Sequence, residues 1–150
     1  MTLADYLPTE LIELQRTAAT WQEAIRIGGN LLYQHGYCEK RYIEAMIQAV
    51  HDLGPYMVVI PGISFAHARP EDGMIRDGIS LINLAQPVNF GHETNDPVSV
   101  VICFGGRNHN THVRMLQALS SYLIEEQHQQ LLKSAMEKEW LLQSIREGEE

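Results

Sequence analysis

The chain of 150 residues is poor in cysteine and contains no long apolar run. Its two cysteines, Cys38 and Cys103, are too few for a disulfide framework, which favours a reducing, cytoplasmic setting. No apolar stretch approaches the ~20 residues that a membrane-spanning helix needs. The first residues also lack the basic start and the apolar stretch of a secretion signal. We therefore expect no direct membrane insertion.

Positive charge is scarce as well, with 11 lysines and arginines against 19 aspartates and glutamates, a net charge of −8. A protein that binds nucleic acid needs basic patches to neutralise phosphates, so this balance argues against a nucleic-acid partner. The hydrophobic share of 45% is that of a globular protein. Because the chain has no repeat, linker or low-complexity tract, we expect one domain over residues 1–150.

The periodicity of the apolar residues predicts layers of helices around a sheet. Helical spacing begins at the capping box of Thr20 and Glu23, returns at residues 40–53, and is seen in three further stretches from about Thr111. Strand-like runs occupy residues 11–15, 57–60, 63–66, 79–84 and 98–104. The last run is continuous and β-branched, which is typical of a strand covered on both faces. These patterns predict an α/β protein, a three-layer α/β/α sandwich with a mixed central sheet.

The segment Gly54–Gly73 carries the chemistry that we consider most informative. It places His67 at the end of an apolar run and Arg69 two residues later. Imidazole is a nucleophile at neutral pH and can accept a phosphoryl group and pass it on without a metal. A nearby guanidinium offers a planar fork of donors to phosphate oxygens. The ordinary alternative is a histidine in a solvated loop.

A second histidine, His112, lies near the start of a helix that follows another strand. Ligands of α/β sheets favour the crevice outside strand ends, and a helix N-terminus attracts anions. If this helix points at His67, a phosphoryl group there would meet backbone N–H groups, His112 and Arg69 together. His92 and His109 lie in loops that could surround the same site.

Neither a metal nor a nucleotide cofactor is expected. His109 and His112 have no matching ligand pair at a typical zinc spacing. The loop Gly105-Gly106 lacks the lysine and the spacing of a nucleotide cradle.

Three motifs resemble one known family. The run GPYMVVIPGISFAHARPEDG from Gly54 to Gly73 resembles the active-site segment of type 2 (mannitol/fructose-like) enzyme IIA domains of the bacterial phosphoenolpyruvate-dependent sugar phosphotransferase system, in particular of the ascorbate-type branch. The segments His92–Val98 and Asn110–Val113 agree in order and spacing. The likeness covers roughly residues 10 to 147 and implies the same α/β/α fold.

The resemblance also implies roles. His67 matches the histidine that is phosphorylated on Nε2, with its other ring nitrogen donating to a backbone carbonyl. His112 matches the second active-site histidine, and Arg69 matches an arginine that we expect to bind phosphate. The implied partners are the phosphohistidine carrier protein HPr, a IIB component whose cysteine accepts the group and, indirectly, the membrane component IIC. We expect these proteins to dock on an apolar patch formed by Ile63, Phe65 and Met74.

One departure from the family is informative. Mannitol-type members carry an arginine in the second helix that reaches the phosphoryl site, whereas residues 44–51 contain none here. This favours the ascorbate-like branch and leaves open which cation replaces that arginine. Two other functions also stay open, a regulatory binding module that reports phosphorylation state and a metal-dependent hydrolase that uses the histidine-rich loops.

Overall fold

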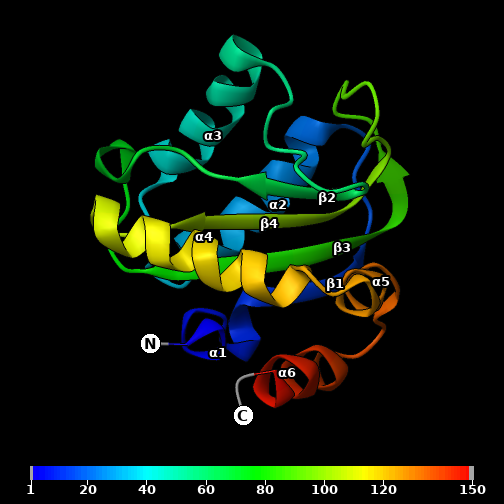
Figure 1. The fold of residues 1–150 in the computed structure, drawn as a ribbon. Coiled ribbons are helices and arrows are strands. Elements are labelled where there is room, and N and C mark those ends of the chain that lie inside the picture. Colours follow the sequence, from blue (N-terminus) through cyan, green and yellow to red (C-terminus); the bar gives the residue numbers. More distant parts are fainter. Residues whose placement is uncertain (1, 149–150) are drawn as a thin grey trace.

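The computed structural model describes residues 2–148, which form a mixed sheet between two layers of helices (Figure 1). The strands run in the order β1-β3-β4-β2 across the sheet. β1 is parallel to β3 and β2 is parallel to β4, whereas β3 and β4 are antiparallel. Their bounds are β1 Ile12–Arg16, β2 Ile63–Ala66, β3 Gly78–Val88 and β4 Val98–Gly105. The expected α/β fold with a mixed sheet is confirmed.

Two helices cover one face of the sheet and three cover the other (Figure 1). The first pair is α2 Trp21–Gln34 and α3 Lys40–Leu53, and the second group is α4 His109–Leu123, α5 Glu126–Ser134 and α6 Lys138–Glu147. The short α1 Leu3–Tyr6 packs against α4 and α6. Two 3-10 turns complete the fold, at Thr9–Leu11 and Pro70–Asp72. No helix among residues 2–148 has the length and apolarity needed to cross a bilayer.

The central strand β4 is buried along nearly its whole length, as its continuous apolar sequence predicts. Helix α2 approaches it closely through Gly28. A Cβ atom at Gly28 would lie 2.8 Å from the Sγ of Cys103, so a larger residue would push the helix off the sheet. This packing keeps α2 close against β4.

Two sequence-based boundaries differ from the structure. Residues 57–60 were expected as a strand, but the chain turns there, with the Val58 amide donating to the Pro55 carbonyl at 3.1 Å. Met57 and Val58 are buried nevertheless, so their apolar character reflects a covering loop. Helix α4 begins at His109, two residues before Thr111, because Asn108 is the N-cap and accepts from the Thr111 amide at 3.0 Å.

The parallel pairing of β2 with β4 decides where the functional residues meet. Parallel strands end at the same edge of a sheet, and β2 and β4 pair from Ile63 opposite Val100 to Ala66 opposite Cys103. His67 follows β2 directly, and β4 leads through Gly105-Gly106 into α4. The residues after both strands therefore lie at one edge.

Candidate active site

His67 is held by its own strand. Its Nδ1 lies 2.8 Å from the carbonyl oxygen of Phe65. A carbonyl oxygen only accepts hydrogen bonds, so Nδ1 of the neutral ring carries the proton. The lone pair of a neutral His67 is therefore on Nε2.

His112 lies beside His67, as the sequence predicted. The centroids of the two imidazole rings are 5.2 Å apart, and the ring planes meet at 63°. The ring of Phe104, the penultimate residue of β4, packs against both, at 5.1 Å from His67 and 5.0 Å from His112. The Nδ1 of His112 is buried and makes no hydrogen bond within residues 2–148. Contact with Phe104 therefore holds both rings from one side.

Both histidines are kept neutral by their surroundings. Burial lowers the pKa of His67, and the hydrogen bond to Phe65 opposes this shift only in part. Burial also lowers the pKa of His112, and the neighbouring His67 and His109 lower it further because two positive charges would repel. A neutral imidazole is the form that can attack an electrophilic phosphorus.

A pocket of about 600 Å³ opens in front of the two rings. One wall is helix α3, and the others are the loop after β2 and the start of α4. The pocket is lined by Ala45, Gln48, Ala49, Asp52, Leu53, Tyr56, His67, Ala68, Arg69, Pro70, Asp72, His109 and His112. His109 thus belongs to the site, as its position allowed. His92 does not line it and instead accepts, through Nδ1, the backbone amides of Thr94 and Asn95.

Arg69 lies at the rim of the pocket. Its side chain is 75% exposed and pairs with Asp72 at 3.3 Å. The same carboxylate accepts the Arg69 backbone amide at 3.1 Å. The guanidinium is thus anchored near the histidines with much of its surface still free for another anion.

Helix α3 contributes no cation to the pocket wall. The polar side chains that α3 adds to this wall are Gln48, which is neutral, and Asp52, which is acidic, and Gln48 donates to Asp52 at 2.8 Å. The cationic or protonatable side chains that do line the pocket, besides His67 and His112, are Arg69 and His109. Arg69 comes from the loop after β2 and His109 from the first turn of α4, so these are the side chains of this pocket that could replace the arginine of mannitol-type members.

The prediction that Ile63 and Phe65 form a docking patch was wrong. Ile63 and Phe65 belong to β2 and are 0% and 3% exposed, and Met74 is only partly exposed. The apolar side chains exposed beside the pocket are Leu53 and Tyr56, and the ring of Tyr56 meets that of His67 edge to face at 6.0 Å. Leu53 is the last residue of α3 and Tyr56 follows Gly54-Pro55, and this position at a helix end could have indicated exposure.

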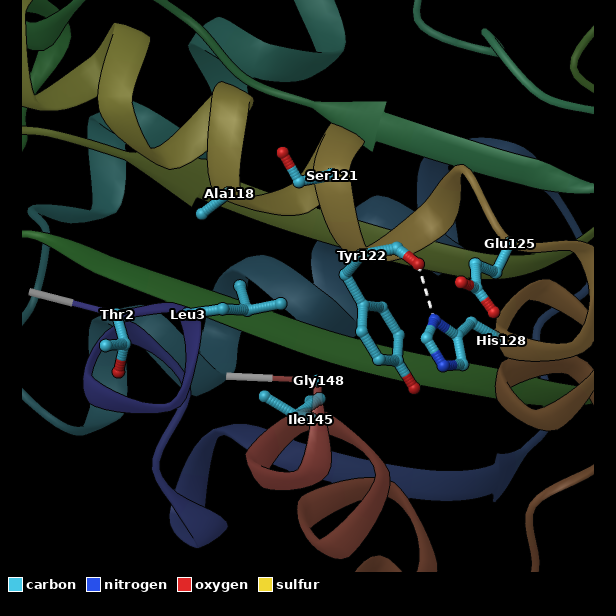
Figure 2. Close-up of a pocket in the computed structure, with 9 residues that line it drawn as sticks. All are labelled: Thr2, Leu3, Ala118, Ser121, Tyr122, Glu125, His128, Ile145 and Gly148. Atoms are coloured by element: carbon cyan, nitrogen blue, oxygen red, sulfur yellow. Dashed lines mark hydrogen bonds between the residues drawn. The ribbon is translucent and has the colours of Figure 1, made fainter. Parts of the chain in front are cut away.

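A second hollow of about 390 Å³ lies between α1, α4 and α6 (Figure 2). Its wall includes Tyr122 and His128, whose rings stack at 4.1 Å while the Nδ1 of His128 donates to the Tyr122 carbonyl at 2.6 Å. None of the residues that the sequence singled out for phosphoryl chemistry lines it. Among residues 2–148, no three histidine, cysteine, aspartate or glutamate side chains are grouped so that they could share a metal ion.

Comparison with known proteins places the chain in a family. Residues 5–148 match the family described as phosphoenolpyruvate-dependent sugar phosphotransferase system, EIIA 2. The chain belongs to this family. An ascorbate-specific EIIA component of this system from Escherichia coli (strain K12) is 39% identical over 144 residues, which cover 94% of each chain. The resemblance that the motifs carry is confirmed.

Solved structures of family members have the same fold. The mannitol-specific cryptic phosphotransferase enzyme IIA from Escherichia coli matches with a TM-score of 0.88 at 33% identity, over 98% of this chain and 99% of that one. The mannitol IIA in a complex with phosphorylated mannitol IIB, also from Escherichia coli, matches with a TM-score of 0.83 at 29% identity, over 93% of this chain and 96% of that one. This EIIA chain is therefore a phosphoryl-carrier component of a phosphotransferase system.

Proposed function

We propose that this chain, as one cytoplasmic domain, accepts a phosphoryl group from the phosphohistidine of HPr on Nε2 of His67 and passes it to a cysteine of a IIB component. In the first step an N–P bond forms at His67 while the donor's N–P bond breaks. In the second step an S–P bond forms on the acceptor while the His67 N–P bond breaks. Each step is an in-line displacement, so the positions of the groups matter most.

The observation that carries this proposal is the hydrogen bond between His67 Nδ1 and the Phe65 carbonyl. It places the proton on the nitrogen that does not react and leaves the nucleophilic lone pair on Nε2. Burial keeps the ring neutral, and the ring lines a pocket that a donor protein could enter. A nucleophile, its orienting group and an opening toward the partner are thus present together.

His112, Arg69 and the first turn of α4 would stabilise the added charge. A phosphoryl group brings a charge of about −1.5 to −2 near neutral pH. Helix α4 begins beside it, and a helix N-terminus carries a partial positive charge. His112 can donate a hydrogen bond to a phosphoryl oxygen when its accessible nitrogen is protonated, and Arg69 can reach from the rim.

The partners are proposed by analogy with a relative. The related mannitol IIA has been solved in complex with phosphorylated mannitol IIB. By analogy, we place the docking of HPr and IIB on the exposed Leu53 and Tyr56 around the pocket, with polar residues at its edge. Because several relatives are ascorbate-specific EIIA components, we assign the system to ascorbate or a similar acidic sugar. The membrane component IIC takes part only through IIB.

The experiment is a phosphorylation assay with phosphoenolpyruvate, the general carrier proteins and candidate IIB proteins. The wild-type chain and His35→Gln should be labelled, since His35 is exposed and lies outside the pocket. His67→Gln should take no label, and labelled wild-type protein should lose its group to a IIB thiol. Unchanged labelling of His67→Gln would overturn the assignment. No observation favours the regulatory module or the hydrolase over this function.

A further inference from the structure

A buried tyrosine bridges the ends of the two strands that carry the site. Tyr42 lies on α3 and is fully buried. Its hydroxyl donates to the Phe104 carbonyl at 2.8 Å and accepts from the Ala68 amide at 3.0 Å. The Ala68 carbonyl oxygen also lies 3.3 Å from this hydroxyl. Burial raises the pKa of Tyr42 well above its usual range, so the hydroxyl keeps the proton that it donates.

The bridge stands where the pairing of the strands stops. The ladder between β2 and β4 ends with Ala66 opposite Cys103. Ala68 and Phe104 lie just beyond this last pair, and His67 lies between Ala66 and Ala68. Beyond this last pair, the Tyr42 hydroxyl connects the segments that follow β2 and end β4, at the point where the reactive histidine leaves the sheet.

The two residues whose backbone groups Tyr42 binds, Ala68 and Phe104, are both next to the reactive rings. Ala68 is the next residue after His67 and fixes the backbone on its far side. Phe104 packs its ring against His67 and His112 at 5.1 and 5.0 Å. A movement of either strand end would therefore change the distance between the two imidazoles.

We propose that Tyr42 is a positioning residue, whose hydroxyl sets the spacing of the two strand ends and thereby the placement of His67 against His112. This inference rests on the proposed role of His67. Without the hydroxyl, the Ala68 amide and the Phe104 carbonyl would be buried without a partner, which is costly enough to make the strand ends shift. A misplacement of about 1 Å can slow a reaction by about a hundredfold.

The test compares two Tyr→Phe substitutions, each of which removes one hydroxyl group. Tyr42→Phe removes the bridge. Tyr122 lies near the other end of α4 (Figure 2), and Tyr122→Phe removes a hydroxyl that bonds Ser144 Oγ at 2.6 Å. The kcat and KM of phosphoryl transfer from HPr and the NMR titration of the His67 ring are measured for both. In Tyr42→Phe we expect kcat to fall about tenfold or more with KM nearly unchanged. We also expect the pKa of His67 to rise toward about 6.5 as water enters. Tyr122→Phe should change neither quantity.

A folded Tyr42→Phe variant with wild-type kcat and a wild-type His67 titration would overturn the proposal. A lower melting temperature without these changes would mean that Tyr42 only stabilises the fold. If no variant, including the wild type, is labelled at His67, the proposed function fails. The ring titration needs no donor and still decides whether Tyr42 positions His67. Should Tyr42→Phe not fold, hydrogen exchange in the wild type replaces it. Protection of the Ala68 amide is expected, and exchange at the rate of a free loop amide would contradict the bridge.

Discussion

The imidazole rings of His67 and His112 lie 5.2 Å apart. His67 follows the edge strand β2, whereas His112 belongs to helix α4, which covers one face of the sheet. Their closeness makes the charge of each ring depend on the other, because a proton on His67 disfavours a proton on His112. It also places His112 where it can contact a phosphoryl group on His67. The two rings are therefore expected to act together on one group, which His67 would carry and His112 would contact.

Removing His112 should separate acceptance from transfer. In His112→Ala, His67 keeps its hydrogen bond to Phe65 and should still accept a phosphoryl group, but more slowly. Transfer to IIB should fall by about a hundredfold, the usual effect of losing one donor to a developing charge. Single-turnover assays of both steps measure this, with His35→Ala as the control. Transfer at the full wild-type rate would exclude this role for His112.

The pH dependence should follow the lowered pKa of the two histidines. Acceptance needs neutral His67, so its rate should stay high as the pH drops through 6.5, the ordinary value for histidine, and decline only at lower pH. A rate that halves at or above this value would contradict the effect of burial. Stopped-flow labelling over a series of buffers gives the midpoint.

The same lowered pKa affects stability. The unfolded chain binds protons at His67 and His112 near 6.5, whereas the folded chain binds them only at lower pH. The free energy of unfolding should therefore decrease as the pH falls below about 6.5, with the contribution fully present above this value. His67→Gln should make the dependence shallower in urea unfolding curves recorded between about pH 7.5 and pH 5. An equally steep dependence in this variant would contradict the assignment.

Arg69 and Asp72 offer a pair of substitutions with opposite expectations. Arg69→Ala removes a cation from the rim and should slow acceptance, by up to about fivefold because the side chain is exposed. Asp72→Asn keeps an oxygen for the Arg69 amide but releases the guanidinium, so acceptance should not slow. Initial labelling rates at low salt measure both. An equal loss in the two variants would show that the loop conformation matters and not the charge of Arg69.

The turn between β4 and α4 should tolerate no side chain at Gly106. A Cβ atom there would lie 2.4 Å from Thr111 Oγ1 and 2.7 Å from the His112 backbone nitrogen, so the start of α4 would have to move. We expect Gly106→Ala to lower the free energy of unfolding by about 1–3 kcal/mol and to slow transfer. Gly148→Ala is the control, since its Cβ would meet no atom closer than 3.6 Å. Calorimetry and the transfer assay together test this.

Much of the fold could be predicted because periodicity and burial agree. The run 98–104 is apolar on both faces and becomes the central strand β4, and Thr20 caps α2 by accepting the Glu23 amide. Residues 57–60 could not be assigned correctly from pattern alone. Their apolar side chains cover the core from a turn, and a short apolar run looks the same in a buried turn and in a strand.

The site residues that belong to sequence motifs could be predicted. Those that reach the site only through tertiary contacts could not. His67, His112 and Arg69 lie together because each follows an element end at the same edge of the sheet. Phe104 packs against both histidines from inside the core, and Tyr42 binds the backbone of Phe104 and Ala68. The sequence patterns of both residues indicate only packing. The error at Ile63 and Phe65 has a similar cause, since β2 is covered on both faces although it is an edge strand.

The most direct test is nitrogen-15 and phosphorus-31 NMR of the chain loaded by phosphoenolpyruvate and the general carrier proteins. The Nδ1 proton of His67 is held by the Phe65 carbonyl. We therefore expect one phosphoryl group bonded to Nε2 of His67, with Nδ1 still protonated. A phosphoryl group on Nδ1 of His67 or on another residue, or the absence of any phosphoryl group, would contradict the proposed function.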